Sequence, residues 1–351
     1  MSFSTKDDSN LSEAILFLNQ ILQFYKQVGP QSMESLTKSY LSSAPTIETA
    51  KDSAEEIMAQ AFKIFDAAVD SVLTKFAAQQ SFDLSKSKNY KHRFEEGYFR
   101  VFYPAIVMYA AWLDREGQKK ALENLDSIFA SFMLGVAGYE ILDSNLDENR
   151  ATPEEILLTM SFIQECERLL LTSFEFEQAD YELLNRFKQL FLRFEIREKQ
   201  LRFKESPYKK EHPEACGYKA VHAYFPFFLL LQKSGKQNQI NDYLQFFYEW
   251  GAPLQIMDDL MDLETDLSNG HYSYPTLGFE DKLHQLSPHE LASLIRSDKQ
   301  HIKNLQKICD ELIGKSKTKC ANLKADFFSY FVYILEERLH AYFSQLLKEN
   351  Q

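Results

Sequence analysis

The sequence predicts an all-α protein, and three observations support that class. The 351 residues include only 11 Gly and 10 Pro, about half the usual share for a globular chain. So few turn formers argue against a sandwich, a barrel or a doubly wound sheet. Apolar residues make up 45% of the chain, enough for a sizeable core, and they recur at helical spacing. We therefore expect one helical domain over residues 1–351, with residues 1–9 disordered.

Apolar periodicity and stop signals define the expected helices. The first ends at Gly29-Pro30, a pair that terminates helices because Gly permits a C-cap and Pro cannot continue the hydrogen bonds. No composition shift or repeat suggests a linker between domains. The expected helical segments are 10–28, 47–78, 98–113, 119–143, 181–203, 216–232, 241–267 and 322–347.

Two helix starts are predicted from capping chemistry. In Thr152-Pro-Glu-Glu155, the threonine caps the first turn, proline occupies a position that needs no N–H, and the glutamate reaches back to the cap. Ser287-Pro-His-Glu290 repeats this arrangement. We expect a helix to begin at each.

Charge and cysteine content exclude several classes of function. The net charge of −12 without a basic run argues against nucleic acid or an anionic membrane as partner. Four widely spaced cysteines without a CxxC pair indicate reduced thiols, and the N-terminus is polar, so we expect a cytoplasmic protein. The longest apolar stretches (101–113, 128–142 and 220–231) are shorter than the roughly 18–20 residues that span a bilayer. Stable membrane insertion is therefore not expected.

An acidic pair closes the apolar helix expected over residues 119–143. In YEILDSNLDE, Asp143 and Asp147 are four residues apart and so share one helix face, about one turn from each other. A solvated helix face explains this pair as well as a metal site does.

A second acidic stripe lies in QIMDDLMDLETD, within the helix expected over 241–267. Asp258, Asp262 and Asp266 recur every four residues, and Gln255 stands one turn earlier. The stripe has apolar neighbours, which are Trp250, Leu254, Ile256, Leu260 and Leu263. A solvated face therefore explains this stripe less well than it explains the first pair.

Both clusters favour a bound cation. Like charges four residues apart destabilise a helix by about 0.2–0.5 kcal/mol per pair. Oxygen ligands without His or Cys suit Mg²⁺, which completes its coordination with waters and substrate phosphates. Two such clusters facing each other across a bundle would hold Mg²⁺ and, through it, a diphosphate.

The two acidic segments resemble the Asp-rich motifs of the isoprenoid synthase superfamily, which contains trans-prenyltransferases and class I terpene synthases. DSNLD, at 143–147, is similar to the first motif, DDxxD, with Ser144 in place of the second aspartate. QIMDDLMD, at 255–262, is similar to QxxDDxxD, the second motif of farnesyl and geranylgeranyl diphosphate synthases. The resemblance extends from residue 97 to residue 275.

This resemblance implies an isoprenoid synthase helical bundle with a central active-site cavity, three Mg²⁺ ions and a prenyl diphosphate substrate. The first four motif aspartates would be catalytic and all five would bind metal: Asp143, Asp147, Asp258, Asp262 and Asp266. The diphosphate would be bound by Arg100, Arg150, Lys219, Gln255 and Arg338. Tyr139 would shape the cavity floor, where family members use side-chain bulk to limit product length; a packed core tyrosine is the alternative.

Departures from the family pattern separate the reactions. Chain elongation needs a second diphosphate site, which the family builds from GKRxRP and from RRG after the first motif. Here Tyr98 stands at the first lysine position of GYFR, and Arg150 has no neighbouring twin. The chain therefore resembles a terpene synthase that ionises a C15 or C20 prenyl diphosphate and cyclises the carbocation.

Three alternatives remain open. The chain could elongate an allylic diphosphate with isopentenyl diphosphate despite its missing basic residues. It could couple two diphosphates head to head, since residues 255–275 also fit the squalene and phytoene synthase motif QxxNxxxDxxEDxxxGRxYxP with His271 in place of Arg. It could be a non-catalytic prenyl-diphosphate binder or partner subunit, which Ser144 favours. The resemblance also implies a homodimer.

Overall fold

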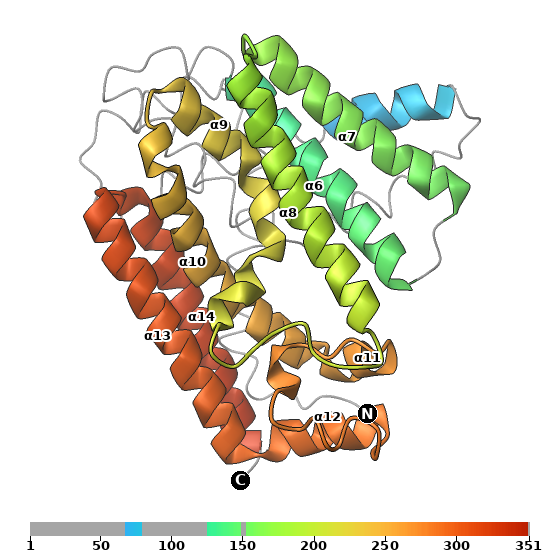
Figure 1. The fold of residues 1–351 in the computed structure, drawn as a ribbon, viewed down its shortest axis with the longest axis vertical. Coiled ribbons are helices and arrows are strands. Elements are labelled where there is room, and N and C mark those ends of the chain that lie inside the picture. Colours follow the sequence, from blue (N-terminus) through green and yellow to red (C-terminus); the bar gives the residue numbers. More distant parts are fainter. Residues whose placement is uncertain (1–66, 79–124, 149–151, 350–351) are drawn as a thin grey trace, which may run out of the picture. The chain divides into compact units, whose positions relative to one another are not determined.

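The computed structural model describes residues 67–78, 125–148 and 152–349 (Figure 1). Every regular element in these ranges is an α- or 3₁₀-helix, and no strand occurs among them. The all-α prediction is confirmed. The expectations for residues 1–9, 10–28 and 98–113, and for most of 47–78, lie outside the described residues.

The chain divides into two compact units. The first comprises residues 1–142 and 152–175, and the second comprises residues 143–151 and 176–351. Helix α6 (Leu125–Glu148) therefore contributes most of its length to the first unit and its last turns to the second.

The first unit contains a helix over residues 67–78, most of α6, and α7 (Pro153–Ser173). Gly138 allows α6 to approach α7 closely, since a Cβ there would lie 2.8 Å from Ile163 Cγ1. The predicted capping box at the start of α7 is confirmed: Thr152 Oγ1 accepts the Glu155 N–H at 3.2 Å, and Thr152 N–H donates to the Glu155 carboxylate at 3.0 Å.

The second unit contains the other described helices (Figure 1). In chain order they are α8 (Gln178–Leu201), η3 (Pro213–Gly217), η4 (Lys219–Tyr224), α9 (Phe225–Lys233), η5 (Gln237–Gln239), α10 (Ile240–Met261), α11 (Leu263–Ser268), η6 (Tyr274–Thr276), α12 (Pro288–Ser297), α13 (Lys299–Leu323) and α14 (Asp326–Glu349). The Ser287 capping box at the start of α12 is confirmed as well.

Helix α10 is the centre of this unit. It packs against η3, α13 and α14, and α13 runs beside α14 (Figure 1). Aromatic rings fill the space around the first half of α10, with Phe247 stacked on Tyr224 at a centroid distance of 4.0 Å and Phe328 5.0 Å from Phe246. These rings pack on one another, so they form core.

Two expected helices differ from the structure. The segment expected as one helix over 216–232 starts as two 3₁₀-helices, and α9 begins only at Phe225. Pro226 explains this, because a proline lacks the N–H for an α-helical bond to the preceding turn and is tolerated only at a helix start. The helix expected over 241–267 is broken between α10 and α11 at Asp262.

Helix α13 was not among the expected segments. Its sequence is rich in lysine, and its buried residues are spaced along a narrow stripe that includes Ile302, Leu305, Cys309 and Leu312. Asp298 caps it by accepting the N–H groups of Gln300 and His301, both at 3.0 Å.

Gly217 is predicted to be essential for the packing of η3 on α10. A Cβ at this position would overlap the Tyr248 carbonyl oxygen and lie 3.0 Å from the Tyr248 Cα. We expect G217A to lower the free energy of unfolding by about 2–3 kcal/mol through overpacking. Urea denaturation followed by circular dichroism measures this.

The matched control is G314A. Gly314 lies inside α13, is exposed, and would meet nothing within 4 Å of an added Cβ. Alanine there should stabilise the protein by up to about 1 kcal/mol. Equal effects of the two substitutions would contradict the proposed close approach at Gly217.

Candidate functional site

The second acidic motif lies where α10 passes into α11. Asp262 ends α10 and precedes α11, with φ −95° and ψ 9°. Helical hydrogen bonds flank the break without crossing it: Asp262 N–H donates to Asp258 O, and Asp266 N–H donates to Asp262 O, both at 2.9 Å. The three aspartates therefore keep their one-turn spacing, while the helix axis changes direction.

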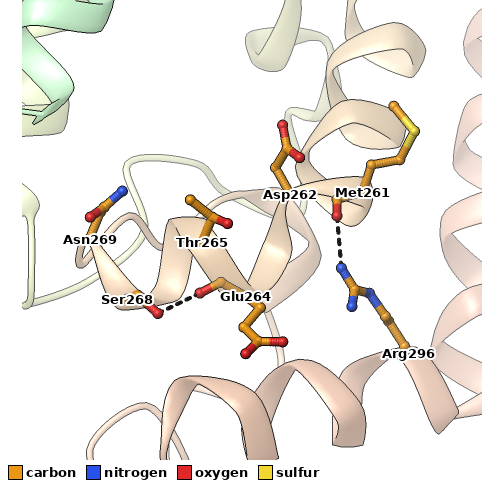
Figure 2. Close-up of a pocket in the computed structure, with 7 residues that line it drawn as sticks. All are labelled: Met261, Asp262, Glu264, Thr265, Ser268, Asn269 and Arg296. Atoms are coloured by element: carbon orange, nitrogen blue, oxygen red, sulfur yellow. Dashed lines mark hydrogen bonds between the residues drawn. The ribbon is translucent and has the colours of Figure 1, made fainter. Parts of the chain in front are cut away.

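An open pocket of about 420 Å³ adjoins this break (Figure 2). Its lining is mainly polar and comes from α10, α11 and α12: Met261, Asp262, Glu264, Thr265, Ser268, Asn269 and Arg296. Asp262 is exposed, whereas Asp258 and Asp266 are half-buried. Asp262 is thus accessible to water and to a ligand. The central cavity expected from the family remains a prediction.

The donor chemistry of this motif fits Mg²⁺. Its candidate ligands are carboxylate oxygens, of which those of Asp262 are exposed, and Mg²⁺ retains several waters when protein ligands are few. In the part of the chain that the structure describes, no group of three or more His, Cys, Asp or Glu is close enough to hold a metal ion. Further ligands are expected from Asp143 and Asp147, whose backbone lies in the last turns of α6. Their side chains lie outside the description.

Asp259, which follows Asp258 directly in the second motif, points into the protein. Its side chain is buried, with 6% of the residue exposed. Gln255 Nε2 donates to Asp259 Oδ1 at 2.8 Å, while Asp259 Oδ2 is buried and has no hydrogen-bond partner among the residues that the structure describes. Burial raises the pKa of this carboxyl well above its usual range, Gln255 opposes the shift, and the charges of Asp266 and Asp258 add to it.

Lys219, a predicted diphosphate ligand, is held by two carboxylates of α8. Its Nζ lies 3.2 Å from Glu195 Oε1 and 3.2 Å from Glu198 Oε2. The Tyr208 hydroxyl donates to the other oxygen of Glu198 at 3.0 Å. Glu195 is buried, and only 20% of the Lys219 side chain is exposed. The ammonium group is therefore an internal counter-ion as well as a candidate ligand.

These charged groups are coupled to the second motif. Burial is the largest cause of the raised pKa of Asp259, and the negative charge of Glu198 adds to it. Burial likewise raises the pKa of the Tyr208 hydroxyl, with contributions from the carboxylates of Glu198 and Asp259. Burial and the same two carboxylates also raise the pKa of the Cys216 thiol. The structure thus brings α8, η3, η4 and α10 together around one acidic interior.

Sequence reasoning missed Glu195, Glu198 and Asp259, although signals were present. In α8 the buried apolar residues recur every four positions at Leu183, Phe187 and Phe191, and the next position is Glu195. A carboxylate on the core-facing stripe of an amphipathic helix needs a partner or a ligand. For Asp259, the signal was its i,i+4 spacing from Gln255.

The remaining predicted residues are Arg338, Tyr139, Arg100 and Arg150. Arg338 is half-buried on α14, where burial lowers its pKa, and it forms no ion pair among the described residues. Tyr139 is half-buried on α6; burial raises the pKa of its hydroxyl, with smaller contributions from Cys166 and Glu167. Arg100 and Arg150 lie outside the described residues.

None of the helices described is both long and apolar enough to cross a bilayer.

Comparison with known proteins shows the fold. No family model matches the chain, and no curated protein matches its sequence. Among solved structures, the crystal structure of heptaprenyl diphosphate synthase from Staphylococcus aureus is similar, with a TM-score of 0.50 and 14% sequence identity. The match covers 75% of this chain and 98% of that one. The chain has an all-α isoprenoid synthase-like fold, as the motifs predicted.

Removing the charge of Lys219 is expected to destabilise the protein. K219M would leave the carboxylates of Glu195 and Glu198 without this counter-ion, at a cost of about 3 kcal/mol for breaking a buried ion pair. The double variant K219M/E195Q should recover part of this loss, because one of the two charges is then neutral. Urea denaturation in EDTA measures both.

The matched control is K317M. Lys317 pairs with Glu336 at 2.6 Å, but half of its side chain is exposed, so its loss should cost no more than about 1 kcal/mol. If K219M and K317M were equally mild, Lys219 would not be the counter-ion of the acidic interior.

Proposed function

We propose that this protein is a Mg²⁺-dependent class I terpene synthase that ionises a linear C15 or C20 prenyl diphosphate and cyclises the resulting allylic carbocation. The observation that carries the proposal is the acidic motif at the α10–α11 break, in an isoprenoid synthase-like fold. Asp262 of this motif is exposed at a polar pocket, which supports binding of a hydrated cation and a diphosphate there.

The residues proposed to hold the metal are the five motif aspartates. They are Asp143, Asp147, Asp258, Asp262 and Asp266. Bound Mg²⁺ would neutralise the negative charge that develops on the departing diphosphate. Three ions remain the expected number.

Two cationic side chains are proposed to bind the diphosphate oxygens. Arg338 is the better supported, because desolvating a guanidinium that has no ion pair in the described chain is unfavourable unless an anion binds it. Lys219 would add to this by exchanging one of its α8 carboxylates for a substrate oxygen. Gln255 holds the buried Asp259 through its amide, so its proposed part is to orient the acidic interior as well as to contact diphosphate. Arg100 and Arg150 remain proposals from the sequence.

Water must be kept from a carbocation until it has cyclised. The described aromatic rings around α10 pack on each other as core, and we propose that this core backs the apolar wall of the expected cavity. We also propose that the side chain of Tyr139 shapes the floor of this cavity.

Chain elongation is the second candidate, and one observation favours it. The protein of similar fold is named a heptaprenyl diphosphate synthase, so this fold serves that reaction in another chain. The altered basic positions, Tyr98 and the single Arg150, favour cyclisation instead. Head-to-head coupling and a non-catalytic binding role would appear as other outcomes of the same assay.

Product analysis separates these functions. Purified protein is incubated with Mg²⁺ and geranyl, farnesyl or geranylgeranyl diphosphate, each with and without isopentenyl diphosphate. A hydrocarbon or terpene alcohol from one allylic substrate alone supports the proposal. Longer diphosphates that form only with isopentenyl diphosphate support elongation, and a dimerised product supports head-to-head coupling. Binding without turnover supports the non-catalytic role.

Asp258 is predicted to be required for turnover. D258N should lower the rate of inorganic diphosphate release by about 100-fold or more, because an amide is a poor Mg²⁺ ligand and the leaving group loses charge neutralisation. The matched control is D281N, which alters an exposed aspartate in the loop before α12. Full Mg²⁺-dependent activity in D258N would show that the motif does not bind the metal.

A further inference from the structure

The end of α10 is held by a side chain from another helix. Arg296 of α12 donates from Nη2 to the carbonyl oxygens of Leu260 and Met261, both at 2.9 Å, and from Nε to Leu260 O at 3.2 Å. Figure 2 shows the bond to Met261 beside Asp262. The last carbonyls of a helix lack intrahelical partners, and a cationic group there also interacts favourably with the helix dipole. Arg296 therefore caps α10 at the break.

The position of Arg296 is fixed by packing. Its neighbour Ile295 is buried in a small apolar cluster that joins α12 to α11, and Leu263 and Leu267 belong to the same cluster. The Ser287 capping box fixes the start of α12. The Arg296 guanidinium therefore extends from α12, which packs against α11, the helix that follows the break at Asp262.

We propose that Arg296 is a positioning residue for the metal-binding aspartates, an inference that rests on the proposed function. By holding the Leu260 and Met261 carbonyls, it sets the angle at which α11 leaves α10, and hence where Asp262 and Asp266 lie relative to Asp258. In Figure 2 the Asp262 carboxylate points away from the Arg296 guanidinium. Arg296 therefore orients the backbone and leaves that carboxylate available to a metal.

Three variants test this proposal. R296M removes the hydrogen-bond donors but retains an unbranched side chain that can fill part of the same space. R296K replaces the guanidinium with an ammonium group, which is still a cationic donor. The matched control is K303M, which removes one positive charge from an exposed position on the adjacent helix α13. If R296M fails to fold, R296Q retains an amide donor and takes its place.

Two measurements do not depend on turnover. Hydrogen exchange of the metal-free protein reports on the break, and the Asp262 and Asp266 amides should exchange faster in R296M than in wild type or K303M. Titration with Mn²⁺, read by electron paramagnetic resonance of the free ion, should show a half-saturating concentration about tenfold higher in R296M, as is typical when an orienting partner of a metal ligand is lost. R296K should recover part of both effects. In the activity assay, the Mg²⁺ requirement should rise in the same order.

The outcomes distinguish this inference from the function on which it rests. Equal Mn²⁺ affinity in R296M and wild type would overturn the positioning role, as would a general loss of thermal stability with unchanged exchange at the break. If wild type binds Mn²⁺ but consumes no prenyl diphosphate, the proposed function fails and the affinity comparison still decides the role of Arg296. If wild type binds no Mn²⁺, both are overturned.

Discussion

Burial of carboxylates beside an apolar core is the constraint on which the second unit depends. Helix α10 is buried for most of its length, yet it ends in an acidic motif. A carboxylate moved from water into such surroundings is unfavourable unless it gains hydrogen bonds, a counter-ion or a proton. The neighbouring groups meet part of that requirement. Lys219 of η4 pairs with the α8 carboxylates Glu195 and Glu198. Gln255 donates to Asp259, and Arg296 of α12 caps the helix end.

Two buried aspartates differ in how far their negative charge is compensated. Asp180 accepts from Gln232 Nε2 at 2.6 Å and from the Glu177 N–H at 2.7 Å, and it pairs with Lys233 at 2.5 Å. Although burial alone would raise its pKa, these partners lower it. Within the described chain, Asp259 accepts a hydrogen bond from Gln255 only, its other oxygen is buried without a partner, and burial raises its pKa. Asp180 therefore ties α8 to α9 as an ionised carboxylate, whereas the ionised form of Asp259 is unfavourable beside Asp258 and Asp266.

The fold class and several helix starts were accessible from the sequence because they depend on local chemistry. Composition and apolar spacing predicted the helices, and the caps at Thr152 and Ser287 form as their residue types require. The acidic spacing of the second motif was accessible for the same reason. Glu195 and Glu198 were not recognised, since their importance arises only when α8 meets Lys219, far along the chain. A single sequence does not show which residues of two separate helices will pair.

The break at Asp262 shows why spacing alone did not predict the geometry of the site. Helical hydrogen bonds link Asp258, Asp262 and Asp266 on both sides of the break, so periodicity gives the same result for a straight and a bent helix. The direction of α11 is set instead by its apolar contacts with α12 and by the bonds from Arg296. A residue 30 positions beyond the motif thus decides where its carboxylates lie relative to one another. The spacing of an acidic motif along a helix fixes the order of its carboxylates. Whether they can reach a common ion depends on contacts with other helices, such as the cap that Arg296 provides here.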